Sequence, residues 1–505
     1  MIRKIIILQI ITIVLMSCKT KDIVNKEQFV IISGQISNFN TNQNQIELHI
    51  YRLFNEKEII TSKLDSLGKF YFCFKSPIPL ETELVYNSNL TVLTHPGDSI
   101  FVRFDGNEKI PELLNTVYFS GNTSKLNNDI VAFNKMLYST YVPLNKVGQS
   151  QAIMQFDIPA FELYLDTLQS GFDNFINQYN TEITPSIEAL NWGKFYLKQI
   201  IYDAIANYQL RHQFQDNTKP AHSIIPVSFY DRFLDSTPID FSIFLNSKEL
   251  PRFIDKYWHF YTTLNYLADE SYKENNTSRG YISPSVKFND SIEYAGIIKY
   301  TPDKLLRQLI LTEKELRNFE RLHIESYEKN QEILSEFIQE PFLKDILTQK
   351  YSLAFDKLNN PQISSDAILK KIKNSTVENI MDSILLTNRG KIIYIDCWAD
   401  WCGPCLEELP NSKKLEEEMN GKDVEFVYVC LDSKEDVWKA IISKHQLNGQ
   451  HYLLSKNQSV EWKKAFNISG VPYYFVIDKN GTIVENGSYL KPKVAKEKIE
   501  SLLKE

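Results

Sequence analysis

Two cysteines separated by two residues end the stretch Trp398-Ala399-Asp400-Trp401-Cys402-Gly403-Pro404-Cys405. The apolar run Ile392–Ile395 comes before this stretch and predicts a strand that is buried on both faces. Residues 402–419 predict a helix, and Pro404 fits its first turn because no N–H is needed there. The two cysteines are therefore expected where a buried strand passes into a helix.

The position of the cysteines favours redox chemistry. A cysteine at a helix N-terminus lies at the positive end of the helix dipole, which lowers the thiol pKa from about 8.5 toward about 7. Cys402 has this position, and Cys405 lies one turn further along the same face. We therefore predict that Cys402 attacks a disulfide and that Cys405 resolves the mixed disulfide.

Alternating strands and helices are expected on both sides of this motif. Val424–Leu431 predicts a second buried strand, which completes a right-handed βαβ unit with the first strand and the helix. A helix is expected at 436–445, and a hairpin at 473–484 around an Asn-Gly turn. A last helix at 492–503 closes this α/β region.

The segment Trp401–Cys405, placed between strand and helix, resembles the signature of the thioredoxin fold. Its surroundings resemble the extracytoplasmic thiol–disulfide oxidoreductases of the TlpA/ResA type, because Glu408 and Pro410 match that group's Cys-x-x-Glu-x-Pro pattern. The resemblance covers residues 366–505. It implies a thioredoxin-like domain with a redox-active Cys402–Cys405 disulfide.

The resemblance also implies roles for single residues. Asp396 matches the group's buried aspartate and is the expected proton acceptor for Cys405, since burial raises the pKa of a carboxyl. Glu408 is expected to assist from the helix. Pro472, in Gly470-Val471-Pro472, is expected to be cis, to shape the substrate groove and to keep metals off the thiols.

The other groove residues implied by the resemblance are Trp401, Gly403, Pro404 and Val471. The chain departs from thioredoxins at Tyr428, which stands where they carry a lysine that pairs with the aspartate. The resemblance implies no cofactor. No metal site is expected either, because a structural zinc site would need a second Cys/His pair nearby.

Three further cysteines leave alternatives open. Cys397, Cys402 and Cys405, with Cys430 beyond, formally fit a plant-type [2Fe–2S] spacing, but Cys397 ends an apolar strand whereas that motif needs an open loop. We expect Cys397 and Cys430 to be buried thiols, and a disulfide between them is the alternative if their strands are neighbours. Cys73, in a predicted strand, is expected to be a small buried hydrophobe.

The first residues predict an export signal. Met1–Lys4 is basic, and the apolar run 5–16 is too short to cross a hydrocarbon core of about 30 Å. The segment ends Leu15-Met16-Ser17-Cys18, which resembles the lipobox of bacterial lipoproteins. That resemblance implies a signal peptide over 1–17, lipidation of Cys18 and a tether over 18–28. An ordinary signal peptide that contains a cysteine is the alternative.

Length and composition predict about three domains in 505 residues. A hydrophobic content of 43% is enough for packed cores, and a net charge of −7 gives no sign of nucleic-acid binding. Short apolar runs at roughly ten-residue spacing predict an antiparallel β-sandwich-like domain over 29–120. From 121 to 360 the apolar period is helical, as in Leu197–Tyr208, and predicts an all-α domain. Within it, Thr301 is expected to cap a helix and 270–289 to form a loop.

These features together predict a membrane-anchored thiol–disulfide oxidoreductase in a bacterial cell envelope, facing the periplasm and acting on protein clients. Whether the inner or the outer membrane holds it stays open. A membrane-bound or soluble thiol would supply electrons. Reduction is favoured because Gly-Pro between the cysteines is the dipeptide of reducing thioredoxins. The alternatives are a disulfide oxidase or isomerase, and a non-catalytic binding lipoprotein with a redox-switch disulfide.

Overall fold

The computed structural model describes residues 28–51, 54, 57–76, 78–140, 142–212, 225, 228–229, 250–275, 290–371 and 376–504. The chain forms two compact units, residues 1–310 and 311–505. The predicted signal peptide, Cys18 and nearly all of the tether lie outside the described residues. Of the helices in the described ranges, none is long and apolar enough to cross a membrane. The predicted domain boundaries stay predictions.

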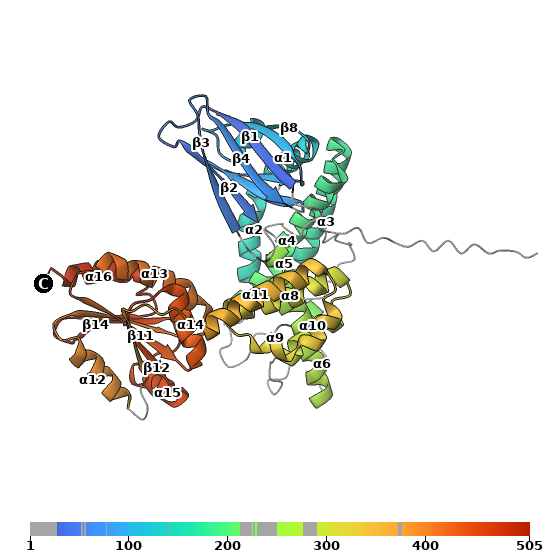
Figure 1. Ribbon diagram of the computed structural model, residues 1–505. Helices are drawn as coiled ribbons and strands as arrows, with labels where there is room; N and C mark the ends of the chain where they lie inside the picture. The colour runs from blue at the N-terminus through green and yellow to red at the C-terminus, as the bar shows by residue number, and fades with distance from the viewer. Residues whose placement is uncertain are drawn as a thin grey trace, which may run out of the picture. The chain divides into compact units, whose positions relative to one another are not determined.

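The first unit begins with two four-stranded sheets (Figure 1). One sheet has the order β4 (Lys69–Ser76), β1 (Gln28–Ser37), β7 (Ser99–Asp105), β8 (Tyr118–Gly121). The other has the order β3 (Lys57–Lys63), β2 (Gln45–Tyr51), β5 (Leu80–Val85), β6 (Asn89–Thr94). Inward side chains from both sheets, such as Val30, Leu48 and Val102, form one hydrophobic core. The strand-rich region predicted from the sequence is therefore present.

Two predictions in this region were wrong in detail. β1 and β7 pair in parallel, so the first sheet is mixed and not antiparallel throughout. The chain between them runs through the whole second sheet, which is long enough to bring β7 back in the same direction. Cys73 is exposed because β4 alternates strictly, with its phenylalanines turned inward and Tyr71, Cys73 and Lys75 turned outward.

Helices fill the middle of the chain, as predicted. In the first unit they are α1 (Ser124–Thr140), α2 (Val142–Gln155), α3 (Ile158–Ile183), α4 (Ile187–His212), α5 (Leu250–Lys256), α6 (Leu264–Asn275) and α7 (Asp290–Tyr300). The Phe133 ring meets those of Phe175 and Tyr179 edge-on, with centroids 5.2 Å apart in both pairs. These aromatic side chains are therefore helix–helix core.

The remaining helices are α8 (Lys304–Glu320), α9 (Glu325–Lys329), α10 (Gln331–Phe337) and α11 (Pro341–Asn359), of which α9 to α11 belong to the second unit. Two local predictions differ from the structure. The first turn of α8 is capped by Asp303, whose Oδ1 accepts from the Leu306 N–H at 2.7 Å, and not by Thr301. The predicted loop over 270–289 is helical up to Asn275, the last residue of α6.

A six-stranded mixed sheet forms the centre of the second unit, in the order β14-β13-β10-β11-β12-β9. Its strands are β9 (Ala367–Lys371), β10 (Ile392–Trp398), β11 (Val424–Leu431), β12 (Gly449–Leu454), β13 (Tyr473–Ile477) and β14 (Ile483–Gly487). Its helices are α12 (Val377–Thr387), α13 (Gly403–Met419), α14 (Glu435–His445), α15 (Lys456–Ala465) and α16 (Pro492–Leu502). Figure 1 shows α12 and α15 on one side of this sheet, and α13 and α16 on the other.

β10 is the central strand of this sheet and is buried along its whole length. It pairs in parallel with β11 and antiparallel with β13. Helices on both faces of the sheet leave no solvated side for β10, which explains its continuous apolar sequence. The α/β arrangement that the sequence predicted for this region is present.

The exposure of the free cysteines gives a direct test of these two units. We expect a maleimide to modify Cys73 in the folded, non-reduced protein and to leave Cys397 and Cys430 unmodified, since both are fully buried. Burial also raises the pKa of both buried thiols, which removes the reactive thiolate. Peptide mapping by mass spectrometry measures each site. In denaturant all three should react, and modification of Cys397 or Cys430 without denaturant would contradict the fold.

Candidate functional site

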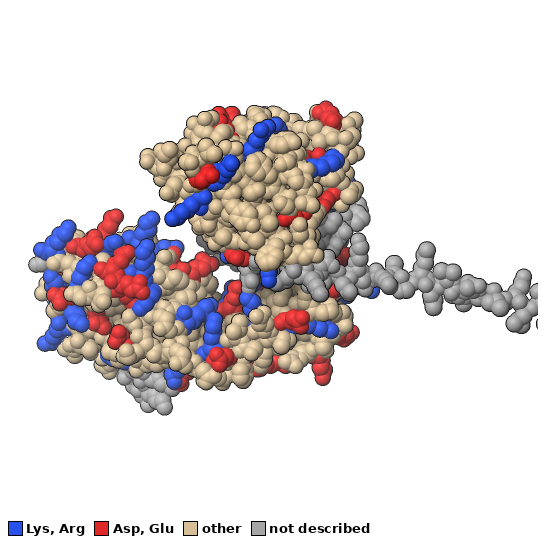
Figure 2. Space-filling view, turned by 45° about the horizontal axis from the view of Figure 1, so that its top comes forward, with Lys and Arg blue, Asp and Glu red and all other residues tan. Residues whose placement is uncertain are grey.

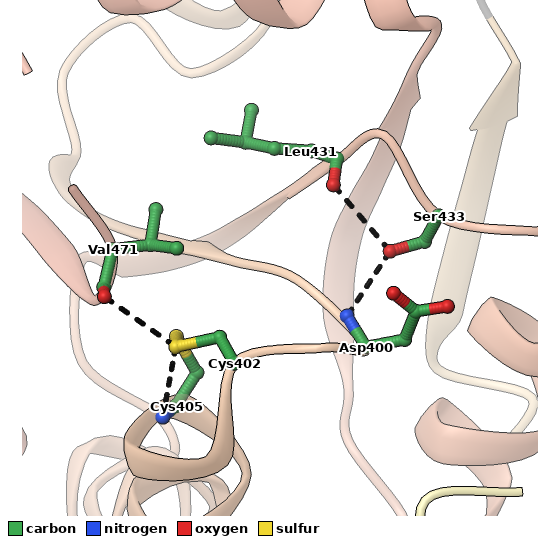
Figure 3. The surroundings of a disulfide bond; sticks show 6 residues. All are labelled: Asp400, Cys402, Cys405, Leu431, Ser433 and Val471. Atoms are coloured by element: carbon green, nitrogen blue, oxygen red, sulfur yellow. Dashed lines mark hydrogen bonds between the residues drawn. A yellow bond between two sulfur atoms is a disulfide. The ribbon is translucent and has the colours of Figure 1, made fainter. Parts of the chain in front are cut away.

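The end of β10 and the start of α13 place Cys402 at the N-cap of the helix. Its Sγ accepts a hydrogen bond from the Cys405 N–H at 3.2 Å, so the first turn of the helix points an N–H at the sulfur. Cys402 and Cys405 are joined as a disulfide, with Cα atoms 5.3 Å apart (Figure 3). The helix dipole and this N–H both favour negative charge on Cys402 when the pair is reduced.

The segment before β13 lies against the disulfide. The Val471–Pro472 peptide bond is cis, as the resemblance implied. The Val471 carbonyl oxygen lies 3.4 Å from Cys402 Sγ (Figure 3). β13 pairs with β10 up to the contact of Tyr473 with Cys397, and this pairing brings Val471 beside the motif. A backbone acceptor is therefore available next to the Cys402 sulfur.

An exposed indole stands beside a nearly buried disulfide. The Trp401 side chain is 48% exposed, whereas Cys402 and Cys405 are 5% and 2% exposed. Pro404 is exposed and Gly403 is partly buried. The expected groove residues Trp401, Gly403, Pro404 and Val471 therefore come together at the disulfide. An exposed indole therefore lies next to a disulfide that solvent barely reaches.

Asp396 is buried on the face of the sheet that α13 covers. Oδ2 of Asp396 accepts a hydrogen bond from the Ser412 hydroxyl at 2.9 Å, and Asp396 is 2% exposed. The pKa of Asp396 is raised to about 7, mainly because burial disfavours the charged form; the Ser412 hydrogen bond lowers it and the Glu408 carboxylate raises it. A carboxyl with this pKa can take up and release a proton near neutral pH.

Glu408 differs from Asp396 in its surroundings. Lys491 Nζ donates to its Oε1 at 2.7 Å, and Asn411 Nδ2 donates to its Oε2 at 3.0 Å. Burial opposes ionisation of Glu408, but these two partners outweigh it and lower the pKa of the carboxyl. Glu408 therefore carries a negative charge at neutral pH and acts on Asp396 through that charge.

The side chains of two residues near the motif contact groups other than the two cysteines. Tyr428 lies opposite Asp396 in the β10–β11 register, yet its hydroxyl donates to Glu416 Oε1 at 2.6 Å. The Asp400 carboxylate points away from the disulfide (Figure 3) and lies 3.5 Å from His323 Nε2. The Asp400 N–H donates to the Ser433 hydroxyl at 3.1 Å.

No sequence motif points to the partners that set these charges, above all Ser412, Lys491 and His323. Ser412 lies 16 residues from Asp396, and Lys491 lies 83 residues from Glu408. No local spacing rule connects residues so far apart.

The other two cysteines of the sheet remain apart. Their strands are neighbours, but Cys397 pairs with Val429 whereas Cys430 pairs with Trp398. Paired residues in a parallel sheet point to the same face, so these two thiols lie on opposite faces. This geometry excludes the alternative disulfide between Cys397 and Cys430, and both are free. It also excludes a cluster that binds all four cysteines.

Comparison with known proteins agrees with this site. Residues 390–483 match the family model described as Thioredoxin-like. Thiol-disulfide oxidoreductase ResA of Bacillus thuringiensis subsp. konkukian is 26% identical over 116 residues, which are 23% of this chain and 64% of that protein. ResA of Oceanobacillus iheyensis is 30% identical over 125 residues, which are 25% of this chain and 60% of that protein.

A solved structure also matches. The crystal structure of the thioredoxin domain of a thiol-disulfide oxidoreductase from Bacteroides vulgatus is 25% identical, with a TM-score of 0.22. The match covers 24% of this chain and 84% of that one. For the two ResA proteins the matched region is 64% and 60% of their length, so this chain spans less than two thirds of these curated relatives.

The buried carboxyl predicts a pH-dependent stability. The folded-state pKa of Asp396 is about 7, above the ordinary 3.8, so between these values the folded state binds more protons than the unfolded state. The free energy of unfolding therefore falls as the pH rises through this window. Asp396→Asn removes this loss, and we expect it to stabilise the second unit at pH 8 by up to about 4 kcal/mol and to have little effect below pH 4.

Chemical unfolding of the oxidised protein, followed by tryptophan fluorescence, measures this difference. Asp382→Asn replaces an exposed aspartate of α12 and is the matched control. We expect the control to change the free energy of unfolding by less than about 0.5 kcal/mol at either pH. Equal stability of Asp396→Asn and wild type at pH 8 would show that Asp396 carries no penalty from burial.

Proposed function

We propose that this chain, whose C-terminal region is a thioredoxin-like domain related to the ResA thiol-disulfide oxidoreductases, exchanges disulfides with protein clients and acts as a reductase. The observation that carries the proposal is the Cys402–Cys405 disulfide at the N-cap of α13, next to the cis Val471–Pro472 bond. The buried Asp396 supports it by supplying a carboxyl that titrates near neutral pH.

The reaction begins with the reduced pair. The Cys402 thiolate attacks one sulfur of a client disulfide, a mixed disulfide forms, and the other client sulfur leaves as a thiolate. Asp396 then takes the proton of the Cys405 thiol. The Cys405 thiolate attacks Cys402 Sγ, which forms the Cys402–Cys405 disulfide and releases the second client thiolate. The client gains two electrons and two protons, and a thiol donor must return the enzyme to the dithiol.

The Gly403-Pro404 dipeptide supports reduction over oxidation, because it is the dipeptide of reducing thioredoxins. The exposed Trp401 and the Val471 carbonyl support a polypeptide client, since one offers an apolar contact and the other a backbone acceptor. Figure 2 shows Lys and Arg interspersed with Asp and Glu on the visible face of the second unit. That distribution suits varied protein clients better than a polyanion.

We expect the protein to work outside the cytoplasm, attached to a membrane of the cell envelope and facing the periplasm. The basic start, the short apolar run and Cys18 support export followed by lipidation. The mature chain would then carry a lipid on Cys18, and the tether would join Cys18 to the β-rich region.

Attack by Cys402 and resolution by Cys405 predict an asymmetry between two variants. Cys405→Ala keeps the attacking thiol and removes the resolving one, so reducible adducts with client proteins should accumulate on Cys402. Cys402→Ala should trap almost nothing, because Cys405 is deeper and lacks the full effect of the helix end. Non-reducing gels measure both, in a Cys73→Ala background that removes the exposed thiol.

Reduction of insulin with dithiothreitol as the electron donor measures turnover in parallel. We expect the wild-type chain to precipitate insulin faster than either variant. Equal trapping by the two variants would refute the assigned roles. Refolding of a reduced client without insulin reduction would identify an oxidase. No trapping and no turnover would leave a binding protein with a switch disulfide as the better account.

The proposed lipid anchor on Cys18 predicts that a variant without this cysteine is released from the membrane. Cys18→Ser removes the sulfur that would carry the lipid, so the variant should leave the membrane fraction while insulin reduction stays unchanged. Fractionation and mass spectrometry of the mature N-terminus measure this. A wild-type N-terminus other than a lipidated Cys18 would refute the lipoprotein assignment and leave the redox proposal intact.

A further inference from the structure

The turn between α8 and α9 lies beside the two cysteines within the second unit. A Cβ atom placed on Gly403 would lie 3.8 Å from Nη2 of Arg321, so the guanidinium is next to the residue that follows Cys402. Two residues further on, His323 Nε2 lies 3.5 Å from Asp400 Oδ2. A segment 81 residues before the motif therefore reaches its edge.

Contacts on both sides of the turn hold it in this place. The Glu320 carbonyl oxygen accepts from Lys444 Nζ of α14 at 3.1 Å, and Glu325 forms an ion pair with Lys434. Leu322 is buried and has a φ of 62°, a strained conformation for a bulky residue. Such strain, about 1–3 kcal/mol, persists only where the surroundings hold the backbone. α11 also packs against α14.

The Arg321 side chain has no hydrogen-bond or ion-pair partner among the residues that the structure describes. It is exposed, and no carboxylate in the described part of the chain pairs with its guanidinium. Two acids close to the cysteines in sequence have other partners, since Asp400 faces His323 and Glu408 pairs with Lys491. The guanidinium therefore has no counter-charge among the described residues, and it lies at the positive end of α13. Both the guanidinium and the helix end would attract an anion.

The proposed reaction supplies that anion, and on this basis we propose that Arg321 is a positioning residue that stabilises the Cys402 thiolate in the reduced protein. In the disulfide form the sulfur is uncharged and the guanidinium has nothing to pair with. Reduction places a negative charge on Cys402, at the helix end and directly before Gly403, which the Arg321 guanidinium approaches. An opposite charge near a thiol favours its ionised form.

Other charged groups around the motif act in both directions. They are Asp396, Asp400, His323, Glu408, Lys491 and Lys463, whose Nζ lies 5.4 Å from the centroid of the Trp401 ring. Burial keeps Asp396 partly protonated near neutral pH, Asp400 faces the His323 ring, and Glu408 pairs with Lys491. Arg321 and Lys463 are thus the cations whose charge no acid in this group offsets.

The test measures the pKa of Cys402 directly and needs no client. The reduced full-length chain is alkylated with iodoacetamide between pH 4 and 9, and mass spectrometry follows the peptide that contains Cys402. We expect Arg321→Gln to raise the pKa of Cys402 by about 0.5 to 1, which slows alkylation at pH 5 by about three- to tenfold. Arg321→Lys should restore most of the rate. In 1 M salt the difference should shrink, because the Debye length falls to about 3 Å.

Arg389→Gln is the matched control, because Arg389 is exposed and precedes β10, at the opposite end of that strand. In Arg389→Gln, alkylation of Cys402 should depend on pH as it does in the wild type. An unchanged profile in Arg321→Gln, or an equal change in Arg389→Gln, would overturn the proposal. Because alkylation requires no turnover, an inactive wild type with a shifted Arg321→Gln profile would refute the proposed function alone.

Discussion

The complete pairing and burial of β10 is the constraint on which the rest of the site depends. β11 and β13 pair with its two edges, and helices cover both faces of the sheet, so its end cannot slide or fray. That fixed end places Cys402 at the start of α13 and Asp396 beneath the helix. Pairing with β13 brings the Val471–Pro472 bond beside the sulfur. One central strand therefore sets the relative positions of Cys402, Asp396 and the Val471–Pro472 bond.

Two opposite environments then divide the chemistry between two groups. The start of α13 favours negative charge on Cys402, whereas burial disfavours it on Asp396 and raises the pKa of that carboxyl to about 7. A helix end lowers the pKa of a thiol, and burial raises the pKa of a carboxyl. Both changes bring the pKa closer to 7, which suits proton exchange at neutral pH. The carboxylate of Glu408 belongs to this division because it is held ionised by Lys491 and acts on Asp396 without exchanging the proton itself.

The centre of the α/β region was predictable because its signals are local and redundant. Continuous apolar runs predicted β10 and β11, and the cysteine spacing predicted α13 within one residue. Short strands such as β8 (Tyr118–Gly121) and β9 were missed because they have too few residues to show a period. α12 was overlooked, although Val377, Ile380, Met381 and Ile384 have the spacing of a helix face. The exposure of Cys73 followed from strict alternation and was overlooked. Contacts such as His323 with Asp400 depend on tertiary packing, which no local pattern encodes.

We propose that Cys402 and Cys405 form a reversible redox pair and not a structural disulfide. Its reduction potential tests this most directly, measured by equilibrating the full-length chain in glutathione or dithiothreitol buffers and counting the alkylated thiols of the motif by mass spectrometry. We predict one two-electron transition between about −270 and −120 mV, the range of thioredoxin-fold oxidoreductases. A pair that stays oxidised below about −300 mV would behave as a structural disulfide and would contradict the account.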